Sequence, residues 1–188
     1  MARRGLLTFQ PTAADLWLAR RMAHVACPQA ERPAKVITWA ADEKLLIAVV
    51  GIAWIGIRLL DDDTRGRRRA DHLMLTTAVS TALPHLLKRG VERERPDRRV
   101  VGWPRHGVPH SGKPYDSFPS GHAVHLGAIA AALVRWMPKP WRSWIWPVVA
   151  GLAGTRLVLL AHWLTDVAAG LAIGAGLEAA LWRRIKPD

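Results

Sequence analysis

The sequence predicts an all-α integral membrane protein, a helical bundle of about five to six spans preceded by an N-terminal helix in the membrane interface. Half of the 188 residues are hydrophobic and are gathered into long blocks, while most of the 27 Lys and Arg residues lie between the blocks. The chain also has ten tryptophans, and several lie in or beside the apolar blocks, as in the aromatic belts of membrane proteins. These are Trp54, Trp136, Trp141, Trp144, Trp146, Trp163 and Trp182.

The formal charge of the chain, +12 at pH 7, would by itself also fit nucleic-acid binding. However, the sequence lacks aromatic residues interleaved with lysine on strands, and its basic residues flank apolar runs. We therefore expect no nucleic-acid partner. The single cysteine, Cys27, excludes an internal disulfide.

Residues 1–42 are predicted to form an N-terminal amphipathic segment. Residues 15–26 alternate apolar and charged side chains at helical spacing, and two adjacent arginines in the middle make a membrane crossing costly. We therefore expect an interfacial helix here. The apolar stretch is too short and too interrupted by charge for a secretory signal peptide. Pro28 and Pro33 predict a linker after this helix.

Residues 43–188 are predicted to form one membrane domain. Its first span, residues 45–60, is strongly apolar, with a single arginine close enough to its end to reach the interface. The second span, residues 70–87, contains several polar side chains, which favours a helix that faces other helices rather than lipid. The residues that interrupt its apolar pattern are Asp71, His72, Ser80, Pro84 and His85.

Three further apolar runs, residues 121–137, 144–160 and 167–182, complete the predicted bundle. Small residues in the last two runs predict close helix packing. They include Gly151, Gly154, Gly170, Gly174 and Gly176. If each run crosses the membrane once, the end of the second span, the start of the third, the end of the fourth and the start of the fifth share one membrane face. Polar residues at these four points are therefore expected to form one site.

The start of the third span is predicted to bind an anion. At Ser117–His122 a polar loop rich in Pro and Gly changes abruptly into an apolar helix, so that Ser120 can cap the helix and Gly121 lets a ligand approach the backbone. Free N–H groups and the positive end of the helix dipole favour an anion at this point. His122, in the first turn, is placed to exchange a proton with the bound group.

A basic cluster leaves the second span. Lys88 and Arg95 are seven residues apart, which is two helical turns, so they point to one side for as long as the helix continues. Both side chains suit a phosphate group. The alternative is an ordinary basic flank of a membrane helix.

Arg156, His162 and Asp166 form a further cluster across the fourth and fifth spans. Asp166 follows His162 by four residues, where a helix would let the carboxylate accept from one imidazole nitrogen and leave the other free as base, nucleophile or ligand. Arg156 lies in an otherwise apolar run, where a charge indicates function. The alternative for Arg156 is a structural ion pair with Glu178 or Asp166.

The order and spacing of these residues closely resemble the three-part signature of the type 2 phosphatidic acid phosphatase family, membrane lipid phosphatases of the vanadium haloperoxidase-like superfamily. The family usually has Ser where this chain has Thr155, which keeps the hydroxyl group. The matching elements are Lys88 with six residues to Arg95-Pro96, then Pro119-Ser120-Gly121-His122, then Thr155-Arg156 with five residues to His162 and three more to Asp166.

The resemblance implies a role for each matched residue. His162 attacks phosphorus and becomes a phosphohistidine, Asp166 fixes its tautomer, and His122 protonates the leaving oxygen and later activates water. No cofactor and no metal are expected, because three cations and a helix start neutralise a phosphoryl transition state by themselves. The phosphate oxygens would be held by Lys88, Arg95, Ser120, Gly121 and Arg156.

Other histidines are given lesser roles. His122 and His125 are three residues apart, but no further ligands follow a metal-binding spacing, so we expect His125 to pack in the interior. His106 and His110, in the loop of residues 96–118, either contact the substrate head group or belong to a solvated basic loop.

The function implied by the resemblance is hydrolysis of a lipid phosphomonoester or pyrophosphate, such as undecaprenyl pyrophosphate, phosphatidylglycerol phosphate or phosphatidate. One alternative is a vanadate-dependent peroxidase, although such enzymes are larger and soluble. Another is a non-enzymatic membrane protein that binds anionic lipid through its basic loops. The resemblance also implies a multi-pass protein of a bacterial plasma membrane with an extracytoplasmic site. The positive-inside rule does not decide the orientation, because both membrane faces carry a comparable number of basic residues.

Overall fold

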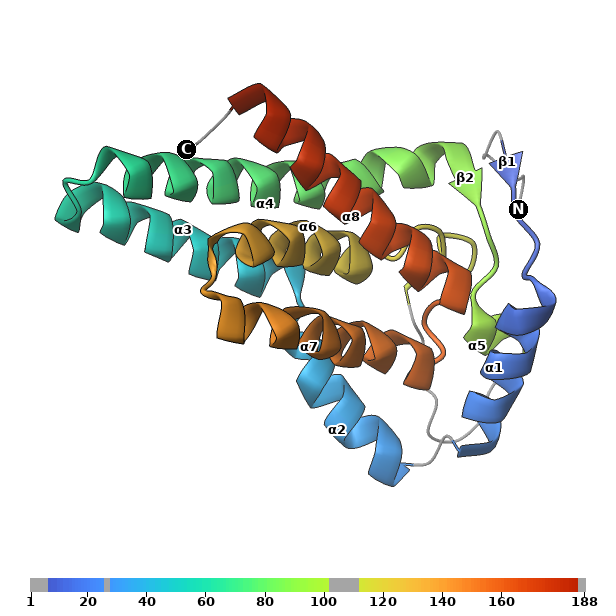
Figure 1. The fold of residues 1–188 in the computed structure, drawn as a ribbon. Helices are drawn as coiled ribbons and strands as arrows, with labels where there is room; N and C mark the ends of the chain where they lie inside the picture. The colour runs from blue at the N-terminus through green and yellow to red at the C-terminus, as the bar shows by residue number, and fades with distance from the viewer. Residues whose placement is uncertain (1–6, 26–27, 102–111, 186–188) are drawn as a thin grey trace.

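The computed structural model describes residues 7–25, 28–101 and 112–185, and helices dominate it. His106 and His110 lie outside these residues. The predicted all-α class is confirmed, apart from a parallel pair of two-residue strands, β1 and β2. The elements in chain order are β1 (Leu7–Thr8), α1 (Ala13–Val25), α2 (Pro28–Trp39), α3 (Glu43–Leu60), α4 (Thr64–Gly90), β2 (Val91–Glu92), α5 (Pro96–Arg99), α6 (Gly121–Trp136), α7 (Lys139–Val158) and α8 (Leu164–Ile185) (Figure 1).

All five predicted apolar runs are helices, namely α3, α4, α6, α7 and α8. Within the described residues, α8 is the helix whose length and composition suit a membrane crossing, with a mean hydropathy of 1.4 over its most apolar window. The helical nature of the five runs is thus confirmed, and the number of spans stays a prediction.

Helix α6 lies in the middle of the bundle, between α4, α7 and α8 (Figure 1). Its contact with α8 is close enough to require glycine on both helices. A Cβ added at Gly127 of α6 would lie 2.3 Å from the carbonyl oxygen of Leu171, and one added at Gly174 of α8 would lie 2.0 Å from that of Val124. This contact fixes the start of α8 beside the start of α6.

The predicted close packing of small residues is correct for Gly170 and Gly174 of α8 and wrong for the other three glycines that were named. Gly170, like Gly174, has no room for a side chain, because an added Cβ would lie 2.8 Å from the Ser120 carbonyl oxygen. Gly151 and Gly154 of α7 and Gly176 of α8 have no heavy atom of the described residues within 4 Å of an added Cβ. These three glycines lie on open helix faces.

The polar side chains of α4 mostly face the interior, as predicted. His72, Thr76 and Ser80 are fully buried, and Ser80 Oγ lies 3.1 Å from His125 Nδ1 on α6. His125 is itself fully buried, which agrees with the packing role expected for it. His85 differs from the prediction, because its side chain is 64% exposed.

The linker predicted around Pro28 and Pro33 is wrong, since residues 28–39 form helix α2. Proline at the first helical position lacks an N–H that would have no partner there anyway, and Pro33 removes one hydrogen bond. Packing compensates for that loss, because Ala34 on α2 is buried against the end of α7 and the turn that follows it, at Leu159 and Ala161.

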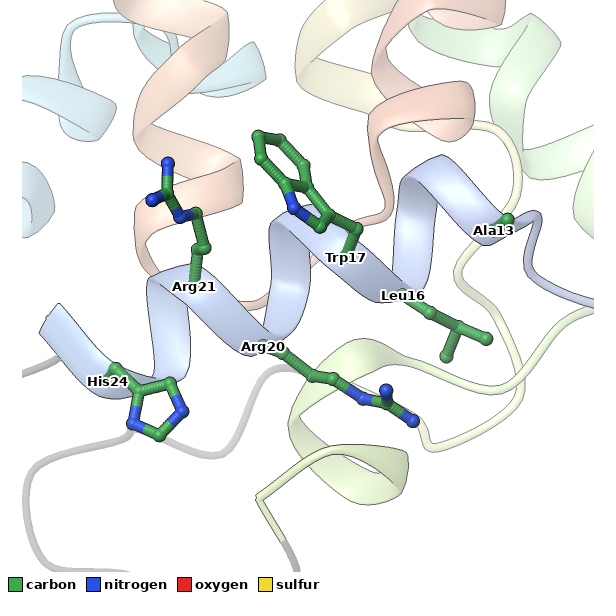
Figure 2. A pocket seen from close by; sticks show the side chains of 6 residues that line it. All are labelled: Ala13, Leu16, Trp17, Arg20, Arg21 and His24. Atoms are coloured by element: carbon green, nitrogen blue, oxygen red, sulfur yellow. The ribbon is translucent and has the colours of Figure 1, made fainter.

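Helix α1 is amphipathic, as predicted. It buries Asp15, Ala19 and Ala23 against the rest of the molecule, whereas Trp17 is 60% exposed and lies under the guanidinium of Arg21 at 5.2 Å. Its outer side carries a shallow hollow of about 420 Å³ (Figure 2). The residues around this hollow are Ala13, Leu16, Trp17, Arg20, Arg21 and His24. The position of α1 in a membrane interface stays a prediction.

Candidate active site

His162 lies in the short turn that joins α7 to α8. The turn reverses the chain within a few residues, and Leu160 adopts a left-handed conformation, with φ of 51°. Such a conformation costs a residue other than glycine about 1–2 kcal/mol. Burial of the Leu160 and Trp163 side chains against α1 stabilises the turn. His162 is thereby held in the interior, at 4% exposure.

The imidazole of His162 has a defined tautomer. Its Nδ1 lies 2.7 Å from the Ser117 carbonyl oxygen, which only accepts hydrogen bonds, so Nδ1 carries the proton. The other ring nitrogen, Nε2, therefore keeps its lone pair. The direct hydrogen bond predicted from the imidazole to the Asp166 carboxylate is not formed, since Oδ2 lies 3.9 Å from Nδ1.

Burial, opposed by the Asp166 carboxylate and aided by the charges of Arg95 and Arg156, lowers the pKa of His162 to about 3. The imidazole is therefore neutral at pH 7. A neutral, buried imidazole with a free Nε2 lone pair is the form that acts as a nucleophile.

Asp166, fully buried in the first turn of α8, is held by three donors rather than by the imidazole. Its Oδ2 accepts from Ser117 Oγ at 2.5 Å and from the Trp163 N–H at 2.9 Å. Its Oδ1 pairs with the guanidinium of Arg93. Ser117 thus joins the two site residues, because its carbonyl contacts His162 while its hydroxyl contacts Asp166.

The cations predicted from the basic cluster come together, although the helix that was expected to align them ends at Gly90. Lys88 Nζ lies 3.9 Å from Asp116 Oδ2, and Arg95 Nη2 lies 2.8 Å from Asp116 Oδ1. Arg95 also donates to the Ala161 carbonyl oxygen at 2.8 Å, one residue before His162. The carboxylate of Asp116 therefore lies between the two cations.

Arg156, near the end of α7, belongs to the same region. The acids considered as its structural partners pair elsewhere, Glu178 with Arg135 and Asp166 with Arg93. Arg156 Nη1 donates to Thr38 Oγ1 of α2 at 3.3 Å, and its buried Nε has no hydrogen-bond partner among the described residues.

The start of α6 lies against the start of α8, since the Ser120 N–H donates to the Asp166 carbonyl oxygen at 3.3 Å. Ser120 occupies the N-cap position as predicted, but its hydroxyl does not cap the helix. Within the described part of the chain, this fully buried Oγ has no hydrogen-bond partner. Of the residues that the structure describes, a Cβ added at Gly121 would meet only Pro84, at 3.8 Å. His122, half-buried, interacts electrostatically with the cations of the site.

The structure thus brings all eight predicted residues to one end of the bundle. A phosphate-sized anion fits this arrangement. Among the residues described, Ser120 and Arg156 offer buried donors without a partner, and Lys88 and Arg95 supply two further cations. Sequence reasoning missed Ser117, Asp116, Arg93 and Asp15, which hold these residues in place. Ser117 and Arg93 lie inside the stretches that were singled out, so their position was a signal, but no spacing rule pointed to their contacts.

A helical bundle with a buried His–Asp pair beside a cluster of cations is the arrangement expected of a phosphoryl-transfer site in the family that the sequence resembles. Residues 71–187 match the PAP2 superfamily. The chain therefore belongs to the PAP2 superfamily, and all eight predicted site residues lie inside the matched region.

Curated relatives include the lipid A 1-phosphatase of Rhizobium johnstonii, which is 38% identical over 105 residues. This match covers 55% of the chain but only 43% of the relative, so the chain spans less than half the length of that protein. The decaprenylphosphoryl-5-phosphoribose phosphatase of Mycobacterium tuberculosis is 33% identical over 132 residues, 68% of this chain and 69% of the relative.

Two crystal structures share the fold. LpxE of Aquifex aeolicus superposes with a TM-score of 0.68 over 94% of this chain and 99% of that chain, at 16% identity. The transmembrane PAP2-type phosphatidylglycerolphosphate phosphatase of Bacillus subtilis superposes with a TM-score of 0.67 over 93% of this chain and 85% of that chain, at 18% identity. The bundle architecture predicted from the sequence is therefore that of known PAP2 proteins.

Proposed function

We propose that this protein is an integral membrane phosphatase that hydrolyses a phosphomonoester or pyrophosphate of a lipid through a phosphohistidine on His162. One observation carries the proposal: a neutral, buried imidazole keeps its Nε2 lone pair free at a site lined by three cations. The named relatives that share this family act on lipid phosphates, which supports the substrate class.

In the first step, His162 Nε2 forms a bond to phosphorus while the bond from phosphorus to the lipid oxygen breaks. His122 gives its proton to that leaving oxygen. Lys88, Arg95 and Arg156 neutralise the phosphoryl oxygens, and the Ser120 hydroxyl and the Gly121 N–H donate to them. The imidazolium formed on His162 keeps its Nδ1 proton and continues to donate it in a hydrogen bond to the Ser117 carbonyl oxygen. The Asp166 carboxylate nearby stabilises its charge.

In the second step, a water molecule attacks the phosphohistidine, and His122 accepts its proton. The N–P bond breaks, phosphate leaves, and His162 returns to its neutral form. The chain's own cations carry the charge neutralisation, so no metal has a role in this scheme.

The membrane setting belongs to the same proposal. Five apolar helices and tryptophans at their ends favour a multi-pass membrane protein. The resemblance to the family supports the finer proposal of a bacterial plasma membrane with an extracytoplasmic site. The substrate candidates are undecaprenyl pyrophosphate, phosphatidylglycerol phosphate and phosphatidate, to which the relatives add lipid A and decaprenylphosphoryl-5-phosphoribose.

Phosphate release by the detergent-purified protein tests this function. Each of the five lipids is offered in excess chelator, with and without orthovanadate, and His162→Ala serves as the control. We expect chelator-resistant, vanadate-sensitive release from at least one lipid and none from His162→Ala. Activity that requires added metal, or that persists in His162→Ala, would contradict the histidine mechanism. Vanadate-dependent halide oxidation without phosphate release would indicate a peroxidase instead.

A further inference from the structure

Helix α1 reaches the candidate site through Asp15, although the signature residues all lie between positions 88 and 166. The Asp15 side chain is buried, at 1% exposure, and accepts hydrogen bonds through both oxygens. Oδ1 accepts from the Thr165 N–H at 2.9 Å, while Oδ2 accepts from Thr165 Oγ1 at 2.8 Å and from the Thr12 N–H at 2.9 Å. The Thr165 N–H belongs to the first turn of α8 and has no carbonyl partner within its own helix. A carboxylate on α1 therefore caps the helix that carries Asp166.

Arg93 connects this capping carboxylate to Asp166. Its guanidinium is 3% exposed and uses one terminal nitrogen for each acid, Nη2 for Asp15 at 2.7 Å and Nη1 for Asp166. Nη1 also donates to Thr165 Oγ1 at 2.7 Å. One buried cation thus serves two buried carboxylates, and removal of the Arg93 side chain would leave both carboxylates without their cation.

The backbone of Arg93 holds the other side of the His162 environment. Its N–H donates to the Tyr115 carbonyl oxygen at 2.9 Å, and its carbonyl accepts from the Ser117 N–H at 3.1 Å. The Ser117 carbonyl oxygen in turn accepts the hydrogen bond from His162 Nδ1. Arg93 therefore contacts both segments that fix the imidazole, the Ser117 loop through its backbone and the start of α8 through its side chain.

The N-terminal segment is anchored to this region at further points. Strand β1 pairs with β2, the Phe9 N–H donates to the Glu92 carbonyl oxygen at 3.2 Å, and Arg99 Nη1 donates to Gln10 Oε1 at 2.8 Å. Figure 1 shows β1, α1, β2 and α5 gathered at the end of the bundle where α8 begins. Asp15 is thus delivered to the site by a docked segment rather than by an isolated helix.

We infer that Asp15 and Arg93 are positioning residues of the reaction, which makes α1 a part of the active site. They hold the first turn of α8, and with it His162 and Asp166, in the geometry for attack on phosphorus. The inference rests on the proposed function of His162. A displacement of about 1 Å at a reacting group is sufficient to cost about 100-fold in rate. Neither residue touches the phosphate, so substrate binding does not depend on them.

The test compares Asp15→Asn with wild type on whichever lipid phosphate the wild-type protein hydrolyses. Asparagine has the same size but only one acceptor oxygen, so at least one donor now held by Asp15 loses its partner. We expect kcat to fall about 100-fold while KM stays within about twofold, because an interaction that acts only on the transition state leaves KM unchanged. The inhibition constant for orthovanadate, which binds the reacting histidine as a phosphoryl mimic, should rise with the loss of kcat.

The matched control is Glu31→Gln on α2. Glu31 is also a buried acid of the N-terminal segment, at 3% exposure, but the structure gives it no contact with His162, Asp166 or Arg93 within the described residues. Its kcat should equal that of wild type. Arg93→Lys is the second variant, because it keeps the buried charge and the backbone contacts and loses the two-pronged guanidinium. All variants are assayed below their measured unfolding temperatures.

The outcomes separate the inference from the proposed function. Wild-type kcat in both Asp15→Asn and Arg93→Lys, in a protein that His162→Ala inactivates, overturns the inference and leaves the function standing. An equal loss in Glu31→Gln overturns it too, because the effect then reflects general damage to the N-terminal segment. Full activity of His162→Ala overturns the function and the inference together.

Discussion

At the scale of single residues, the candidate site differs from its sequence signature through Ser117. The spacing of His162 and Asp166 predicted a direct hydrogen bond, yet the carboxylate lies 3.9 Å from Nδ1 and the Ser117 carbonyl accepts the hydrogen bond from Nδ1 instead. The sequence does not show which backbone carbonyl accepts this hydrogen bond, since every residue has one. Asp166 therefore acts on the imidazole as a nearby charge and through the Ser117 hydroxyl, rather than as its hydrogen-bond acceptor.

This arrangement predicts different effects for substitutions at Asp166 and Ser117. Asp166→Asn removes the charge that stabilises the imidazolium and should lower kcat by about 10³-fold, because a unit charge about 4 Å away contributes about 4 kcal/mol at an effective dielectric constant of about 20. Ser117→Ala keeps the carbonyl and loses only the hydroxyl, so its loss should be about tenfold. Initial rates of phosphate release, measured on folded protein, check both. Equal losses for the two variants would show that the hydroxyl, not the carboxylate charge, matters to the imidazole.

At the scale of helices, the contact of α6 with α8 holds the two halves of the site together. Each helix starts at the site, and glycine lets their backbones approach far closer than side chains would allow. Small residues were predicted to pack closely from composition alone. That reasoning failed for Gly151, Gly154 and Gly176, because composition does not show which face of a helix meets a neighbour.

A pair of glycines on α8 tests this contact. Gly174→Ala places a methyl group against the Val124 carbonyl and should destabilise the protein by about 1–3 kcal/mol, the usual cost of overpacking. Gly176→Ala, two residues along the same helix, meets no heavy atom of the described residues within 4 Å. Thermal unfolding in detergent measures both. A midpoint that falls equally in the two variants would mean that helix propensity or detergent, not the contact, governs the effect.

At the scale of the whole molecule, the helices and the gathering of the eight site residues followed from hydrophobic patterning and from counting chain reversals. The contacts that orient those residues did not. Asp15 and Thr165 are 150 residues apart, Arg93 and Asp166 are 73 apart, and Ser117 and His162 are 45 apart. Contacts at such separations leave no periodic pattern, and they depend on the tertiary fold. The helix at residues 28–39 was missed for the same reason, because packing on α7 outweighs its prolines.

The stability of the molecule should depend on pH through His162. Its pKa is lowered from 6.5 to about 3 by burial, so between these values the unfolded chain binds a proton that the folded chain does not. The contribution of the neutral His162 to the free energy of unfolding is therefore fully present above pH 6.5. As pH falls below this value, the free energy of unfolding decreases by about 1.4 kcal/mol per pH unit. Unfolding temperatures between pH 7.5 and 5 should fall more steeply for wild type than for His162→Gln. Parallel curves would contradict a buried neutral imidazole.

The hydrogen bonds between Asp15 and Thr165 also bear on when the site is completed during synthesis. Their two partners are separated by 150 residues, so the carboxylate leaves the ribosome long before the helix that it caps exists. Loop closure at this separation costs only slightly more entropy than closure of a loop half as long. The delay thus comes from translation rather than from chain entropy. A nascent chain that has already made α1 to α7 holds most of its bundle, and its chemistry begins only once the start of α8 arrives.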